Sequence, residues 1–390
     1  MPAQLDILAL EPFYGGVRRS MLETVIRCSR HRWTVLKLPP RRIERRLSVA
    51  ANWFAEQLSR HWSGRVDLLF TSEAMNLSSL YRLVPALARQ PSVVYFHDNQ
   101  LPDPLAPSRA GARYDEPPRW LYARNGAVDA PPPPPIAPSR DGSVDLVNLN
   151  TATSATEIWF NSLYHLRSFL GKASKLVDRH PELSSHNPMA DVTAKAQVMP
   201  PPIDLNLIAH VKATAKLPPR DPRAIFVDTR DADVTLLNEG LAVLAKAGEK
   251  FRLITVGPVE EISDQWTRRT IPENDDFAQV AGLLEAGVVL SVKPGAACDL
   301  QVIRGLLAGC RAVLPDVGVY AELLPGSLHG DCLYGPTADA LAEHLHNGLD
   351  TLVGWYPPDF RQTLKHFEAI TATRAFDERL NNLAAAHAVG

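Results

Sequence analysis

The sequence predicts an α/β protein built from two doubly wound, Rossmann-like domains in tandem, and three observations support this fold class. The chain has 390 residues, which is more than one hydrophobic core usually serves. Apolar runs typical of buried parallel strands alternate with helical stretches. Residues 200–222 carry prolines at both ends and separate two such series, so they predict the boundary. The two sheets are expected to face each other across a cleft.

The first domain is expected at residues 1–205. Its five predicted strands are LDILALE (5–11), WTVLKLP (33–39), VDLLFTS (66–72), SVVYFHD (92–98) and EIWFNS (157–162). An insertion at 108–142 breaks this rhythm, because the five consecutive prolines at 131–135 favour an extended polyproline helix without backbone donors. The insertion is either an exposed tether or a proline-rich ligand for a partner.

A linker at 206–220 leads to the second domain, which is expected at 221–355. Its predicted strands are RAIFVDT (223–229), FRLITVG (251–257), GVVLSVK (287–293) and RAVLPD (311–316). Helical periodicity marks the intervening stretches VTLLNEGLAVLAKAG (234–248), DDFAQVAGLLEAG (275–287) and DLQVIRGLLAGC (299–310). The second domain therefore repeats the alternation of the first.

The composition is that of a soluble globular protein, with 45% hydrophobic and 22% charged residues. No apolar stretch approaches the roughly 20 residues that cross a bilayer, and the N-terminus lacks a signal-peptide pattern. We therefore expect a cytoplasmic protein with no membrane partner. The four cysteines have no paired short spacing, so they are expected to be reduced core residues, and no metal is expected. The sequence does not indicate an oligomeric state.

Positive charge is concentrated near the N-terminus. Residues 18–46 contain ten basic and two acidic residues, so this segment carries +8 in a chain whose net charge is −2. One interpretation is a solvated surface. The other is a contact with nucleic-acid phosphates, for which the candidates are Arg18, Arg19, Arg41, Arg42, Arg45 and Arg46.

Three predicted strands of the first domain end in clusters of polar residues, within EPFYGG (11–16), TSEAMNL (71–77) and YFHDNQ (95–100). The carboxyl ends of parallel strands meet at one edge of a sheet, so these residues are expected to line one crevice. His97 and Asp98 could bond sugar or acceptor hydroxyls. Gly15 and Gly16 would let backbone N–H groups approach a phosphate, although a tight turn without a ligand explains them equally well. Together the three strand ends predict a functional site.

Five ordered motifs resemble the tRNA-queuosine mannosyltransferase-like family of retaining GT-B glycosyltransferases. They are ILALEPFYGG, FTSEAMNLSSL, YFHDNQL, FNSLYHLRSFL and MPPPIDL, and LLAGCRAVLPDVGVYAELLP extends the resemblance into the second domain. The resemblance implies a GT-B fold, a nucleotide-sugar donor such as GDP-mannose held by the second domain, and queuosine in tRNA as acceptor, with no other cofactor. It also implies that helices at 356–390 cross back onto the first domain.

The same resemblance implies roles for individual residues. His97, Asp98 and Asn99 would lie at the reacting centre. Substrate binding would use Glu11, Tyr14, Gly15, Gly16, Glu73, Asn76, Gln100, Asn161, Tyr164 and His165. Donor binding would use Arg230, Lys293, Gly295, Arg304, Tyr320 and Glu322. The basic segment at 18–46 would contact tRNA.

The donor motif departs from the family's pattern. Counted back from the shared AGC at 308–310, the family's histidine falls on Gly295 and its two donor-binding glutamates fall on Ala296 and Arg304. Arg230 keeps the diphosphate-contacting arginine, whereas the lysine is lost to Thr235. The chain is then an enzyme with a remodelled donor site, an impaired enzyme that binds RNA or regulates a partner, or a glycosyltransferase for another acceptor. In an impaired enzyme, a carboxylate should neutralise Arg304 and protein should fill the space above 295–297.

Overall fold

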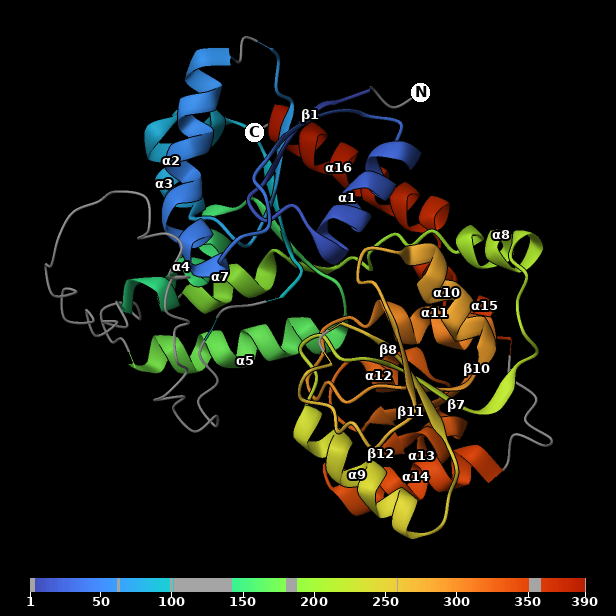
Figure 1. Ribbon diagram of the computed structural model, residues 1–390. Coiled ribbons are helices and arrows are strands. Elements are labelled where there is room, and N and C mark those ends of the chain that lie inside the picture. Colours follow the sequence, from blue (N-terminus) through green and yellow to red (C-terminus); the bar gives the residue numbers. More distant parts are fainter. Residues whose placement is uncertain are drawn as a thin grey trace, which may run out of the picture.

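The computed structural model describes residues 4–61, 64–98, 101, 142–179, 188–257, 259–350 and 359–389. Figure 1 shows two α/β domains, one above the other in this view. Each domain contains a six-stranded sheet whose paired strands are parallel. The prediction of two doubly wound domains is therefore confirmed. The proline-rich insertion predicted at 108–142 lies outside the described residues, apart from its last residue.

The sheet of the first domain has the strand order β2-β1-β3-β4-β5-β6. Its strands are β1 (Asp6–Glu11), β2 (Arg32–Lys37), β3 (Leu68–Ser72), β4 (Ser92–Phe96), β5 (Glu157–Phe160) and β6 (Ala196–Val198). Its helices are α1 (Gly16–Cys28), α2 (Ile43–His61), α3 (Leu77–Leu83), α4 (Gly142–Ser154), α5 (Leu163–Arg179) and α7 (Pro188–Ala194).

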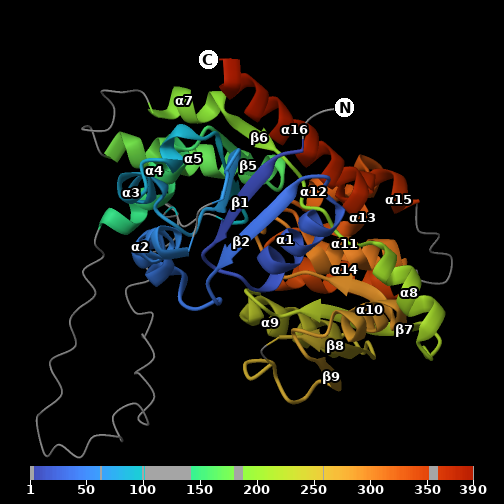
Figure 2. The same cartoon turned by 90° about the horizontal axis from the view of Figure 1, so that it is seen from above.

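Alternate residues of these strands fill two cores, one on each face of the sheet. Leu8 and Phe96 lie in the core under α2, α3, α4 and α5, whereas Ile7 and Tyr95 lie in the core under α1. Figure 2 shows α2, α3, α4 and α5 on one side of the sheet and α1 on the other. Burial on both faces explains why the strands read as nearly continuous apolar runs.

The sheet of the second domain has the order β12-β11-β10-β7-β8-β9. Its strands are β7 (Asp221–Asp228), β8 (Arg252–Val256), β9 (Arg268–Ile271), β10 (Ala286–Leu290), β11 (Arg311–Pro315) and β12 (Leu333–Tyr334). Helices α10 and α11 cover one face and α9 and α14 the other. The helices are α8 (Asn206–Thr214), α9 (Val234–Lys246), α10 (Asp276–Glu285), α11 (Leu300–Ala308), α12 (Tyr320–Leu323), α13 (His329–Cys332) and α14 (Ala338–Asp350).

The C-terminal helix α16 (Ala369–Val389) lies on the first domain beside α1, although the chain reaches it from the second domain through α15 (Phe360–Thr363) (Figure 1). Phe376 is buried in the same core as α1. The Ser29 hydroxyl at the end of α1 donates a hydrogen bond to Asp377 Oδ1 at 2.6 Å. These contacts tie the end of the chain to the first domain. Within the described ranges, no helix is long and apolar enough to cross a membrane.

Candidate functional site at the domain interface

Four strands of the first sheet end at one edge, and each is followed or ended by a polar residue. Glu11 ends β1, while Glu73, His97 and Asn161 come just after β3, β4 and β5. The parallel register of these neighbouring strands places the four positions side by side. The structure thus brings together the polar strand ends that the sequence singled out.

The Glu73 carboxylate organises this edge. Its side chain is completely buried and forms an ion pair with Arg18 of α1. It also accepts hydrogen bonds from the backbone N–H groups of His97 at 3.2 Å and Asp98 at 3.3 Å. Glu73 therefore fixes both the start of α1 and the chain that follows β4. His97 is half-buried and Asp98 is exposed, while the predicted site residues Asn99 and Gln100 lie outside the described part of the chain.

Glu11 closes the turn that follows β1. Its carboxylate accepts hydrogen bonds from the Phe13 N–H at 2.8 Å and from the Ser72 hydroxyl at 3.0 Å. Burial raises the pKa of Glu11 to about 7, although the nearby charge of Arg18 acts in the opposite direction. The position of Glu11 is thus set by local hydrogen bonds that shape the glycine turn.

Asn161 and His165 form a hydrogen-bonded pair beneath His97. Asn161 Nδ2 donates to the His97 carbonyl at 3.0 Å, and Asn161 Oδ1 lies 2.9 Å from His165 Nδ1. Burial lowers the pKa of His165 to about 3, so the ring is neutral. The asparagine oxygen can only accept, so Nδ1 carries the proton and Nε2 is left as an acceptor. Nε2 is buried and has no partner among the described residues.

Acid is expected to destabilise the protein through His165. Its pKa in the folded protein, about 3, is below the ordinary histidine pKa of 6.5, so the unfolded chain takes up a proton first as the pH falls. The contribution of His165 to the free energy of unfolding is present above pH 6.5. It should decrease by about 2 kcal/mol between pH 7 and pH 5. Urea titrations of the wild type and of His165→Gln at both pH values measure this contribution. An equal loss of stability in both proteins would contradict it.

The turn between β1 and α1 brings backbone donors to the interface. Gly16 has a φ of 52°, which favours glycine, and a β-carbon at Gly15 would lie 2.5 Å from Pro40 Cγ. No side chain caps the start of α1 in the described structure. The N–H groups of its first turn are therefore available to an anion.

Tyr14 and Asn76, both predicted to bind substrate, have local partners. The Tyr14 hydroxyl donates to Glu23 Oε1 at 2.6 Å. Asn76 Oδ1 accepts a hydrogen bond from the Ser79 N–H at 3.0 Å and thereby caps α3. Each residue thus has a structural role within the first domain.

Glu322 links the second domain to the first. Its carboxylate accepts hydrogen bonds from the N–H groups of Leu163, at 3.0 Å, and Tyr164, which are the first two residues of α5. A carboxylate at a helix N-terminus is stabilised both by these donors and by the helix dipole. In this structure the Glu322 carboxylate caps α5, and its binding to the donor stays a prediction.

The same end of α5 covers the turn at 295–297 that replaces the family's histidine and glutamate. The Ser162 hydroxyl donates to the Ala297 carbonyl at 2.8 Å. Gly295 has a φ of 79°, and a β-carbon there would lie 3.2 Å from the Tyr164 hydroxyl oxygen. The Tyr164 hydroxyl thus lies close to this turn at Gly295.

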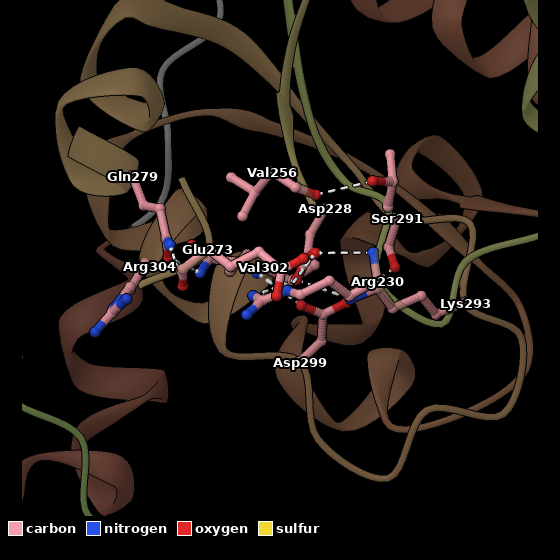
Figure 3. A network of polar contacts seen from close by, with 12 residues as sticks. Asp228, Arg230, Val256, Glu273, Gln279, Ser291, Lys293, Asp299, Val302 and Arg304 are labelled. Atoms are coloured by element: carbon pink, nitrogen blue, oxygen red, sulfur yellow. Dashed lines mark hydrogen bonds and ion pairs between the residues drawn. The ribbon is translucent and has the colours of Figure 1, made fainter. Parts of the chain in front are cut away.

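The two predicted diphosphate-binding cations share one buried carboxylate, shown in Figure 3. Arg230 binds Asp228 through Nε at 2.9 Å and Nη2 at 2.8 Å, and Lys293 Nζ lies 2.8 Å from Asp228 Oδ2. Burial opposes ionisation of Asp228, but hydrogen bonds from Arg230 and the charge of Lys293 outweigh it and lower its pKa. The charges of Glu273 and Asp299 also act on Arg230, so acidic and basic side chains meet at the end of β7. A diphosphate would share these cations with Asp228.

A cavity of about 550 Å³, here called the interface cavity, lies between the domains. One wall is α1, beginning at Gly16, and the opposite wall is formed by α10, α11 and the segment before α10. Four basic and four acidic side chains line it, so their formal charges balance. They are Arg19, Arg27, Arg230 and Arg304 together with Glu23, Asp204, Glu273 and Asp276.

Arg304 lies in this cavity wall and is only 3% exposed. Its Nη1 donates to Asp276 Oδ1 at 3.0 Å. Arg304 is therefore neutralised by a nearby carboxylate, which is a feature expected of an impaired donor site. Sequence reasoning missed Asp276, because the pairing joins two helices and carries no local signal.

Tyr320, also predicted to bind the donor, is a core residue. It is completely buried, and its hydroxyl lies 2.6 Å from Ser291 Oγ and 3.2 Å from Asp299 Oδ2. Asp299 Oδ1 in turn caps α11 by accepting from the Val302 N–H at 3.2 Å. The donor-binding prediction for Tyr320 is corrected, because these bonds use its hydroxyl inside the domain.

The predicted RNA-binding arginines fall into two groups. Arg18 is buried against Glu73, so its assignment to an RNA surface is corrected. Arg19 is exposed and pairs with Glu23 at 2.9 Å. The remaining four, with Val49, line a surface hollow of about 780 Å³ between β2 and the first turns of α2, and this arginine cluster comprises Arg41, Arg42, Arg45 and Arg46.

Comparison with known proteins finds a family and a fold. The family model described as tRNA-queuosine alpha-mannosyltransferase N-terminal matches residues 6–117 and 131–203. A tRNA-queuosine alpha-mannosyltransferase of Drosophila melanogaster is 23% identical over 366 residues, which cover 88% of this chain and 87% of that protein. The matched residues include the motifs at all four polar strand ends.

Solved structures share the two-domain architecture. Sucrose-phosphate synthase from Thermosynechococcus elongatus superimposes with a TM-score of 0.63 at 13% identity, over 98% of this chain and 100% of that one. HepE from Anabaena, in complex with UDP and glucose, gives a TM-score of 0.60 at 13% identity, over 97% and 100% of the two chains. These similarities confirm the predicted GT-B fold.

Proposed function

We propose that this chain, whose residues 6–117 and 131–203 match the tRNA-queuosine alpha-mannosyltransferase N-terminal model, transfers a hexose from a nucleotide-sugar to queuosine in tRNA. GDP-mannose is the first donor to test, and the configuration at the anomeric carbon is expected to be retained. A tRNA acceptor would place the activity in the cytoplasm.

The observation that carries this proposal is the interface cavity, because it joins an uncapped helix N-terminus to the Arg230 guanidinium at the end of β7. The first N–H groups of α1 and the Arg230 side chain both border it. A donor diphosphate placed there would be held by backbone donors from one domain and a guanidinium from the other. These groups would stabilise the diphosphate as it leaves, which is the main electrostatic requirement of glycosyl transfer.

The acceptor is proposed to lie at the polar strand ends of the first domain. His97 and Asp98 would bond the hydroxyls of queuosine and hold one of them near the anomeric carbon. Glu73 and Asn161 fix the backbone of this segment through hydrogen bonds, so their proposed role is to position it. The arginine cluster would hold tRNA phosphates near this edge, since β2 and α2 belong to the same domain.

The test is a transfer assay with the full-length protein, tRNA that contains queuosine, and a panel of GDP-, UDP- and ADP-sugars. Nucleosides from the digested tRNA are analysed by mass spectrometry. We expect the queuosine nucleoside to gain one hexose with at least one donor, and tRNA lacking queuosine to remain unmodified. No gain with any donor would contradict the proposal.

Removing the arginine cluster should weaken tRNA binding in a salt-dependent way. Each lost phosphate contact reduces the slope of log K against log salt by about 0.7–0.9, so the loss of four contacts should flatten it by up to about 3.6 units. The variant replaces with serine Arg41, Arg42, Arg45 and Arg46. A control with the same change of net charge replaces with serine the exposed residues Arg82, Arg89, Arg361 and Arg374. An unchanged slope in the first variant would show that the cluster is only a solvated surface.

A catalytically impaired RNA-binding protein is the second candidate, and two observations favour it. Asp276 neutralises Arg304, and the Tyr164 hydroxyl lies close to Gly295 in the turn at 295–297. Such a protein would bind tRNA through the arginine cluster yet transfer no hexose in the assay above. The two measurements together therefore separate the candidates.

A further inference from the structure

Two buried polar atoms on α11 have no hydrogen-bond partner among the described residues, and both belong to side chains that line the interface cavity. They are Arg304 Nε, a donor, and Gln301 Oε1, an acceptor. Arg304 and Gln301 are each 3% exposed. Buried polar groups usually have partners, because an unsatisfied one is costly. Two such atoms at one cavity wall therefore point to a ligand that supplies both partners.

The rest of each side chain is held in place. Gln301 Nε2 donates to Gln279 Oε1 at 2.6 Å, and Gln279 Nε2 donates to the Glu273 carbonyl at 2.9 Å. Arg304 contacts Asp276, whose side chain is 54% exposed. An exposed carboxylate is readily rehydrated, so an anion on a ligand can replace it at the guanidinium.

This position is separate from the cations at the end of β7. In Figure 3, Arg304 lies beside Gln279 on the far side of the Asp228–Arg230 pair from Lys293. Arg230 and Lys293 already contact one carboxylate together, so they form one anion site. Arg304 and Gln301 line the interface cavity at a different place.

We propose that the nucleotide-sugar bound in the interface cavity carries a second anionic group, a phosphate or a carboxylate, and that Arg304 binds it. This inference rests on the proposed donor site. Arg304 would bind the oxyanion through Nε and a terminal nitrogen, as guanidinium groups do with carboxylates and phosphates. Gln301 Oε1 would accept a hydrogen bond from a hydroxyl beside it. A ribose phosphate with a free neighbouring hydroxyl and a uronic acid both present this arrangement.

Matched probe pairs distinguish the two sources of the anion. Guanosine and adenosine 3′,5′-bisphosphates are compared with GMP and AMP, and UDP-glucuronate is compared with UDP-glucose, by calorimetric titration of the full-length protein. In at least one pair, the member with the added anion should bind roughly tenfold more tightly. No preference above about twofold in any pair would overturn the proposal.

Two variants test whether the preference for the probe with the added anion depends on Arg304. Arg304→Gln should abolish the preference within the pair, whereas Asp276→Asn should increase it, because the competing carboxylate is gone. Arg311→Gln, which changes a similarly buried arginine outside the cavity lining, is the control and should keep the wild-type preference. Equal weakening of both pair members by R304Q, or no gain in D276N, would contradict the role of Arg304.

The transfer assay distinguishes failure of the second anion site from failure of the proposed function. Efficient hexose transfer from GDP-mannose that R304Q leaves unchanged would support the proposed function and overturn the second anion site. An anion preference that depends on Arg304, in a protein that transfers no hexose, would support the site and contradict the proposed function.

Discussion

Replacement of Glu73 with leucine is expected to lower the free energy of unfolding by about 3–5 kcal/mol, because it removes the carboxylate that forms the ion pair with the buried guanidinium of Arg18. The Glu73 side chain is fully buried, and the Arg18 side chain is only 10% exposed. The variant also removes the acceptor for the N–H groups of His97 and Asp98. Both the start of α1 and the proposed acceptor-binding segment should therefore loosen, and urea titration of wild type and variant measures the loss.

The double variant Arg18→Met with Glu73→Leu separates the ion pair from the packing of these side chains. Replacing both partners by apolar residues removes the uncompensated charge, so the double variant should recover most of the stability lost by E73L. A loss below about 1 kcal/mol in E73L would contradict a central role for this carboxylate.

The strand ends could be predicted from the sequence because parallel sheets constrain them strongly. Residues such as Val94 and Ile158 are fully buried, so each strand reads as an apolar run, and the polar residue that follows it must emerge at the same edge of the sheet. This reasoning brought Glu11, Glu73 and His97 together before any contact was known. It could not give the hydrogen bonds that Glu73 accepts from the backbone N–H groups of His97 and Asp98, since these depend on the turn that follows β4.

The net charge of residues 18–46 did not reveal that Arg18 is buried, because net charge carries no information about which face of a helix a residue occupies. In α1, Arg18 lies three, four and seven residues before Met21, Leu22 and Val25, which are all buried. That spacing puts Arg18 on the buried stripe of the helix, so its periodicity could have identified it as an internal residue. The C-terminal end of this basic segment, at residues 41–46, lies in a loop and the first turn of α2. No buried helical stripe includes all four arginines there.

The donor side could be predicted only in part. The loss of the glutamates at Ala296 and Arg304 was visible in the motif itself. The contacts that Arg304 and Glu322 make join segments that are distant in the sequence. Arg304 on α11 contacts Asp276 on α10, and Glu322 contacts the start of α5 in the other domain. Such tertiary pairings leave no periodic or local signal in a single sequence.

Filling the interface cavity is expected to abolish donor binding. Ser20 lies on the α1 wall of the cavity, so Ser20→Trp would place an indole where the nucleotide-sugar is proposed to bind. The steric overlap should weaken binding by about 100-fold or more. The exposed residue Ser59 on α2 offers a matched control, because Ser59→Trp adds the same indole away from the cavity.

Calorimetric titration of the wild type, S20W and S59W with GDP-, UDP- and ADP-sugars tests whether the nucleotide-sugar site lies between the domains. At least one nucleotide-sugar should bind the wild type and S59W with equal affinity, and S20W should not bind it although its thermal unfolding remains cooperative. Equal binding by a folded S20W, or no binding of any nucleotide-sugar by the wild type, would contradict a donor site in this cavity.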